Sequence, residues 1–131
     1  GIDLKKNPII IHNAYYDRAG ITKRFIINLL IRINSELDAD FKIDDFDFYC
    51  HYNPENGKVK SYLVSLKKQA VQLKSIGKVL EFDQNELIWT ELSKKYDQNE
   101  IDTLARLTNF KVKHSYMDCK HFFTDSLWEK R

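Results

Sequence analysis

The sequence predicts a mixed α/β protein, which is of α+β type when the chain is taken by itself. Three observations predict this class: a long amphipathic helix, a middle block with strand-like alternation, and an end that combines one short helix with two strands. The chain has 131 residues, of which 43% are hydrophobic and 31% are charged. This composition is typical of a folded globular domain with a moderate core.

The clearest predicted element is a helix from Ala19 to Leu37. Apolar side chains recur along it every four positions, at Ile21, Phe25, Leu29, Ile33 and Leu37, and Ile26 and Leu30 widen this stripe. This spacing predicts about five helical turns with one apolar face, which we expect to pack on a core. Asp17 precedes the segment and is expected to be its N-cap, where a negative charge suits the helix dipole.

The middle of the chain is expected to form one antiparallel meander with a buried face and a solvated face. Its predicted strands are "FDFYCHY" (46–52), "KVKSYLVSL" (58–66), "QAVQLKSI" (69–76), "KVLEF" (78–82) and "ELIWTEL" (86–92). The turn "NPENG" separates the first two strands, since Asn, Pro and Gly favour tight turns.

The end of the chain is predicted to be a helix followed by two strands. Asp97 with Glu100 three residues later is a variant of the capping box, and "DQNEIDTLARL" has helical spacing of its apolar residues. "FKVKHSYMD" (110–118) and "HFFTDSLWEK" (121–130) then alternate like strands with a tight link between them.

Charge is unevenly distributed, although the formal net charge is only +2. Residues 36–55 carry seven acidic side chains and one lysine, whereas residues 56–80 carry six lysines and no acid. An RNA-binding surface is one interpretation of the lysines. We prefer two solvated faces that pair loosely, because the lysine-rich strands lack the clustered aromatic side chains that stack on single strands. No nucleic-acid partner is therefore expected.

Several other classes of site and location receive no support from the residues. Cys50 and Cys119 lie in apolar, strand-like segments without metal-ligand spacing, which indicates small apolar side chains in a reducing, cytoplasmic protein. The four histidines are scattered, so no metal site is expected. No apolar run approaches the ~18 residues of a membrane span. No motif for nucleophilic catalysis or phosphate binding is present, so no catalytic residue is assigned.

Two short segments could bind a ligand. In "AYYDRAGIT" (14–22), Tyr15 and Tyr16 precede the start of a helix, where amides favour an anionic group and a tyrosine hydroxyl can add a hydrogen bond. In "WTELSKKY" (89–96), Glu91 and Ser93 share one strand face and could hold a ligand that carries N–H donors. The alternative for the first segment is that Asp17 only caps the helix and one tyrosine packs on the core. The alternative for the second segment is an exposed strand end with ordinary polar residues.

Four ordered segments carry a resemblance to a known family: "GIDL", "AYYDRAGITKRFIINLLIRINSELDADF", "HYNPENGKVKSYLVS" and "TELSKKY". In this order and style, the chain resembles the C-terminal part of the histidine-specific, S-adenosylmethionine-dependent Nα-methyltransferases of ergothioneine biosynthesis. The resemblance covers nearly the whole chain. Four ordered motifs are far more specific than any one of them alone.

The resemblance implies the C-terminal part of a Rossmann-like methyltransferase that carries an inserted antiparallel-sheet substrate domain. Residues 1–12 would be the end of a methyltransferase strand and a linker. Residues 13–95 would be the substrate-binding domain, and residues 96–131 the last helix and strand hairpin of the methyltransferase fold. S-adenosylmethionine would be bound mainly by a preceding part of the protein.

The resemblance also implies site residues. Tyr15 matches the family tyrosine that contacts the backbone groups of the amino-acid substrate, and Tyr16 is left as a packing residue. Glu91 and Ser93 match the pair that recognises the imidazole. Ser61 stands where the family often has a methionine that lines the side-chain pocket, so the substrate is histidine or a related amino acid.

The expected function is therefore that of a methyltransferase fragment that recognises a small amino-acid substrate and lacks the methyl-donor site. The only methionine is Met117, and the opening "GIDLKK" is typical of the tail of a strand, which we interpret as an internal or C-terminal piece, inactive by itself. The alternative is a non-enzymatic α+β module that binds a ligand or a protein.

Overall fold

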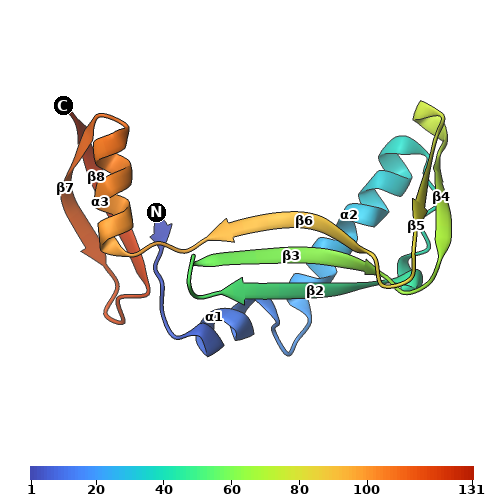
Figure 1. Ribbon diagram of the computed structural model, residues 1–131, viewed down its shortest axis with the longest axis horizontal. Helices are drawn as coiled ribbons and strands as arrows, with labels where there is room; N and C mark the ends of the chain where they lie inside the picture. The colour runs from blue at the N-terminus through green and yellow to red at the C-terminus, as the bar shows by residue number, and fades with distance from the viewer. The chain divides into compact units, whose positions relative to one another are not determined.

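The computed structural model describes residues 1–131, and the chain divides into two compact units (Figure 1). The first unit contains residues 1–11, 52–59 and 93–131, and the second contains residues 12–51 and 60–92. Helices and antiparallel sheets are both present, in agreement with the predicted mixed α/β class.

The second unit combines a long helix with a three-stranded sheet. Helix α2 spans Ile21–Leu37, close to the predicted segment. The sheet has the strand order β2-β3-β6, with β2 at Phe46–Asn53, β3 at Lys58–Ser65 and β6 at Leu87–Lys94. A short 3-10 helix, η1 (Ile43–Asp45), leads into β2.

The prediction of one continuous meander is wrong. Strands β4 (Gln69–Leu73) and β5 (Lys78–Phe82) form an antiparallel two-stranded sheet of their own. The 3-10 helix η2 (Lys74–Ile76) and Gly77, with a φ of 62°, make the turn between them. The chain then returns to pair β6 with β3. Alternation identifies strands and their buried face, but it does not specify which strands become neighbours.

The core of the second unit brings α2 together with side chains from β2 to β5 and the preceding loop. Aromatic rings dominate it: Phe46 meets Phe82 edge to face at 5.7 Å between centroids, and Phe41 lies 5.6 Å from Phe46. The buried members are Ile26, Ile27, Leu30, Phe41, Phe46, Phe48, Cys50, Leu63, Val71, Leu73 and Phe82.

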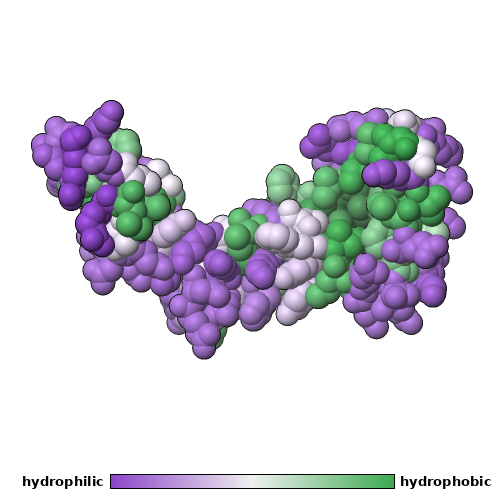
Figure 2. Space-filling view, turned by 45° about the horizontal axis from the view of Figure 1, so that its top comes forward, coloured by the Kyte–Doolittle hydropathy of each residue, from purple (hydrophilic) through white to green (hydrophobic).

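The apolar stripe predicted for α2 is confirmed in part: Ile26, Leu30, Ile33 and Leu37 face the core, whereas the first members of the stripe do not. Ile21 and Phe25 are 62% and 70% exposed, and apolar surface of the second unit is visible in Figure 2. The fully buried side chains of the helix are Ile26, Ile27 and Leu30. An α-helix has 3.6 residues per turn, so a strict four-residue repeat drifts by about 40° at each step and cannot stay on one face.

The first unit pairs a three-stranded sheet with one helix. The sheet has the order β1-β8-β7, where β1 is Ile2–Asp3, β7 is Phe110–Met117 and β8 is Phe123–Lys130. Helix α3 (Gln98–Leu107) packs against β7. Its capping box is confirmed, since the Asp97 carboxylate accepts from the Glu100 amide and the Glu100 carboxylate accepts from the Asp97 amide, both at 2.9 Å.

Helix α1 (Pro8–Tyr15) has no counterpart among the predicted elements. Its three consecutive isoleucines are β-branched and resemble a strand. The residues that start the helix lie just before the isoleucines. Pro8 occupies the first helical position, and the Asn7 side chain accepts a hydrogen bond from the Ile9 amide at 2.9 Å.

The acidic and lysine-rich segments contact each other within the second unit. Lys67 pairs with Asp45 at 2.8 Å and Lys74 with Asp38 at 4.0 Å, in agreement with two loosely paired solvated faces. These contacts occupy part of the positive charge that a nucleic acid would need.

The two cysteines differ in their surroundings. Cys50 is buried in β2, and burial raises the pKa of its thiol. Cys119 is exposed in the turn between β7 and β8, so the strand-like setting expected for it is wrong. No helix of the chain combines the length and apolar character needed to cross a bilayer.

Candidate functional site

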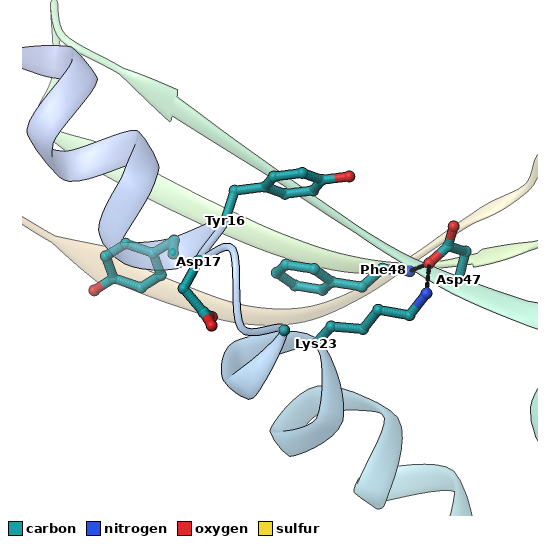
Figure 3. Close-up of a pocket in the computed structure, with 7 residues that line it drawn as sticks. Tyr16, Asp17, Lys23, Asp47 and Phe48 are labelled. Atoms are coloured by element: carbon teal, nitrogen blue, oxygen red, sulfur yellow. Dashed lines mark hydrogen bonds and ion pairs between the residues drawn. The ribbon is translucent and has the colours of Figure 1, made fainter.

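A small cavity of the second unit opens where α1 leads into α2 (Figure 3). Its volume is about 200 Å³, below the roughly 300–1,000 Å³ of sites for drug-sized ligands and suited to a smaller molecule. It is lined by Tyr15, Tyr16, Asp17, Gly20, Lys23, Asp47 and Phe48.

The start of α2 shapes one side of this cavity. The N-cap residue is Gly20, with a φ of 67°, so the prediction that Asp17 occupies the N-cap position is wrong. The Asp17 carboxylate nevertheless accepts hydrogen bonds from the amides of Ile21 at 2.7 Å and Thr22 at 2.8 Å. Backbone hydrogen bonds from Thr22 and Ile21 lower the pKa of Asp17 to about 2, so the side chain is a carboxylate at neutral pH.

Two tyrosines at the end of α1 form the aromatic part of the wall. The ring of Tyr16 is stacked with Phe48 at 6.2 Å and with His12 at 5.7 Å between centroids. Figure 3 shows the rings of Tyr16 and Phe48 beside the same space. Tyr15 is half-buried and also packs against the core. Tyr16 is 57% exposed, but its ring packs on Phe48 and His12, as expected for a packing residue.

An ion pair closes the side of the cavity between α2 and β2. Lys23 Nζ lies 2.6 Å from Asp47 Oδ1, and this hydrogen bond lowers the pKa of Asp47. Both side chains are about half exposed, so solvent screens the pair and it adds little to stability. The cavity therefore presents aromatic faces beside one ammonium and two carboxylates, a combination that suits a small zwitterion.

Glu91 and Ser93 both lie on β6, as the predicted strand requires. The Glu91 side chain is exposed, and its carboxylate makes no hydrogen bond or ion pair in the structure, so it can accept from a ligand. Its backbone oxygen accepts from Trp89 Nε1 at 2.9 Å. Ser93 is half-buried, and its Oγ accepts a hydrogen bond from Lys95 Nζ at 2.9 Å.

Ser61 is 1% exposed on β3. It lies on the buried face of that strand with Leu63 and Ser65, and its backbone oxygen accepts from the Thr90 hydroxyl at 2.9 Å. This hydrogen bond ties β3 to β6 one residue before Glu91. Ser61 does not line the cavity at the start of α2, where Tyr15 is the one predicted site residue.

Three further residues of the cavity have no local signal in the sequence. Lys23 resembles any exposed helix lysine, and Asp47 and Phe48 follow the ordinary alternation of a strand. Asp47 and Phe48 meet Tyr15 only because α2 packs against β2, which brings together residues more than thirty positions apart.

Comparisons with known proteins decide the family. A family model described as a histidine-specific, SAM-dependent methyltransferase matches residues 1–130. The chain belongs to this family. A histidine N-alpha-methyltransferase of Mycobacterium tuberculosis is 33% identical over 96 residues, covering 73% of this chain and 30% of that protein. Its counterpart in Mycolicibacterium smegmatis is 32% identical over 106 residues, covering 80% of this chain and 33% of that protein. The chain spans about a third of the length of the curated relatives it matches.

The methyl donor implied by the family is S-adenosylmethionine. Rossmann-type cofactor sites use a glycine-rich turn that leads from a strand into a helix. The four glycines of this methyltransferase-family chain are isolated. Gly20 lies between two helices, Gly57 in the β2–β3 turn, Gly77 before β5 and Gly1 before β1.

Proposed function

We propose that this chain supplies substrate recognition to a larger S-adenosylmethionine-dependent methyltransferase that acts on the α-amino group of histidine or a related amino acid. The family match over residues 1–130 carries this proposal. The small charged cavity beside Tyr15 supports it, because its size and mixed charges suit an amino acid.

Tyr15 is the proposed contact to the backbone groups of the substrate. It stands at the end of α1 beside the first amides of α2, where a tyrosine hydroxyl can donate to a carboxylate or accept from an amine. The neighbouring pair of Lys23 and Asp47 offers one charge of each sign in the same cavity.

Glu91 and Ser93 are the proposed contacts to the substrate side chain. A carboxylate accepts from an imidazole N–H, and a hydroxyl can complete the recognition of the second ring nitrogen. Ser61 replaces a bulkier family residue and is proposed to leave more room near this side chain, which makes it a determinant of which related amino acids are accepted.

The proposed architecture places residues 1–12 at the end of a methyltransferase strand, residues 13–95 in the substrate domain and residues 96–131 in the last helix and hairpin of a Rossmann-like fold. The donor site would then come mainly from a preceding part of the protein. We propose accordingly that residues 1–131 alone neither bind the donor usefully nor methylate.

Methyl transfer to an α-amine requires a nitrogen with a free lone pair, so the substrate ammonium must lose its proton before it reacts. S-adenosylmethionine supplies an electrophilic methyl group when it is bound. The contribution of this chain is to hold the amino acid at both ends, which fixes the direction of the amine. No side chain of residues 1–131 is assigned as a catalytic residue.

The test is histidine binding by calorimetry to the full-length protein that carries this chain. We expect Glu91→Ala to weaken binding by at least about tenfold, because an N–H of the ring loses its charged acceptor. Glu81→Ala on β5 is the matched control, since it also removes an exposed strand glutamate, and it should bind like the wild type. Equal affinities of the two variants would contradict the assignment of Glu91.

The alternative function is a non-enzymatic binding module. It predicts that the full-length protein, supplied with S-adenosylmethionine and histidine, produces no methylated histidine detectable by mass spectrometry. Nα-methylated product would exclude this alternative.

A further inference from the structure

Lys23 is the only cationic side chain that lines the cavity at the start of α2. It extends from the first turn of the helix past the ring of Phe48 to Asp47 (Figure 3). The residues that line the cavity all belong to the second unit. An anionic group that enters this cavity therefore meets a single ammonium.

The first amides of α2 are not available to such an anion. The two oxygens of the Asp17 carboxylate accept hydrogen bonds from the Ile21 amide at 2.7 Å and the Thr22 amide at 2.8 Å. This carboxylate also places a negative charge at the positive end of the helix dipole. An anionic group of a ligand must therefore find its charged partner elsewhere in the cavity.

The Lys23 ammonium has donors left for a ligand. Lysine carries three N–H donors, and the contact with Asp47 Oδ1 at 2.6 Å accounts for one of them. The same oxygen accepts from the Phe48 amide at 2.7 Å, which fixes the Asp47 carboxylate on β2. Asp47 thus holds the end of the lysine at the wall of the cavity and leaves two donors free.

Stability gives the ion pair between Lys23 and Asp47 little weight. The two side chains are 52% and 47% exposed, and ion pairs in contact with solvent contribute little to a fold. For the same reason the pair costs little to rearrange. The carboxylate of a ligand can therefore join Asp47 on the ammonium, or replace it.

We infer that Lys23 binds the α-carboxylate of the substrate and restricts the enzyme to free amino acids. The inference rests on the proposed function, in which this cavity holds the backbone groups of the substrate. The α-amine is one carbon atom away from the carboxylate, so fixing the carboxylate also limits where the amine can lie. The N-terminal histidine of a peptide has a neutral amide in place of the carboxylate and loses the charge-assisted hydrogen bond.

Two ligands that differ only at the carboxylate test this inference. The affinities of histidine and histidinamide are measured by calorimetry on the full-length protein, as the wild type and as Lys23→Met, which keeps a long side chain without the charge. We expect Lys23→Met to weaken histidine binding by at least about tenfold, the size of one charge-assisted hydrogen bond, and histidinamide binding by less than about twofold. The amines of the two ligands differ in basicity, but this difference is the same for both proteins and cancels from the comparison.

Lys68→Met is the matched control. Lys68 Nζ lies 3.5 Å from Asp83 Oδ1 in the second unit, and neither side chain lines this cavity. The variant also removes an exposed, ion-paired lysine, so it should bind both ligands like the wild type. A loss of histidine affinity in Lys23→Met that is no larger than the loss in Lys68→Met would overturn the inference.

The inference and the proposed function fail in different ways. A wild-type protein that does not bind histidine contradicts the proposed function itself. Normal wild-type binding, with histidine and histidinamide weakened by the same factor in Lys23→Met or with neither weakened, overturns the inference alone. Glu91→Ala removes the proposed contact to the ring, which both ligands carry, so it should weaken both by the same factor and leave the preference for histidine unchanged.

Discussion

Two glycines with nearly the same backbone conformation have different surroundings. Gly57 and Gly77 have φ values of 69° and 62°, in the region that other residues avoid. A Cβ added at Gly57 would lie 2.3 Å from the backbone oxygen of Lys95, whereas a Cβ at Gly77 would have no neighbour within 4 Å. Gly57 therefore allows the Lys95 backbone to approach closely, in addition to forming the turn.

We predict that Gly77→Ala lowers the free energy of unfolding by about 1–2 kcal/mol, which is the strain of alanine in a left-handed conformation. Gly57→Ala should lower it clearly more, because the backbone at Lys95 must also move. Urea unfolding of both variants measures the difference. Equal losses would show that the close contact at Gly57 has no energetic weight.

Charged side chains hold the first turn of helix α3 through a capping box and ion pairs. Glu100 completes the capping box and pairs with Lys94 at 2.8 Å and Lys5 at 3.0 Å. Burial raises the pKa of Glu100, but hydrogen bonds from Lys94, from the Asp97 amide and from Lys5 outweigh it and lower the pKa to about 2. The folded protein therefore favours the charged form of this side chain.

This pKa predicts a pH dependence of stability. Since the pKa of Glu100 is about 2 in the folded state against an ordinary 4.5, its contribution is present above pH 4.5 and is lost as the pH falls toward 2. Glu100→Gln should reduce the free energy of unfolding at pH 6 by about 1 kcal/mol, and the deficit should shrink by pH 2.5. Urea titrations at both pH values measure this.

Glu81→Gln, an exposed glutamate on β5, is the control for Glu100→Gln and should match the wild type at both pH values. A deficit of Glu100→Gln that is the same at pH 6 and pH 2.5 would mean that the charge of Glu100 is not what stabilises α3.

At the scale of the whole molecule, each unit has side chains that are removed from water. Leu63 of the second unit is 1% exposed and Ile101 of the first is fully buried. Leu63→Ala and Ile101→Ala should each cost about 2–5 kcal/mol of unfolding free energy, because each leaves a cavity. Leu107→Ala, at a side chain that is 74% exposed, should change it by less than about 0.5 kcal/mol. A small cost at Leu63 or Ile101 would contradict the assignment of these residues to a core.

Most helices and strands could be predicted from local sequence patterns, but the pairing of distant segments could not. The capping box at Asp97 and the strands of the middle block could be read directly, because turns, caps and alternation are local. The separate β4–β5 sheet and the exposure of Ile21 and Phe25 on α2 could not be, since both depend on which distant segments become neighbours. The same limit applies to the candidate site: Tyr15 could be named from its motif, but Lys23 and Asp47 join it only in the folded chain.

The two-residue strand β1 has a consequence for synthesis on the ribosome. Residues 2 and 3 pair with Phe123 and Thr124 of β8, so they are translated some 120 residues before their partners. The second unit ends at residue 92 and can complete its contacts while β8 is still untranslated. Within residues 1–131, the strand that is translated first is thus among the last to find its partner.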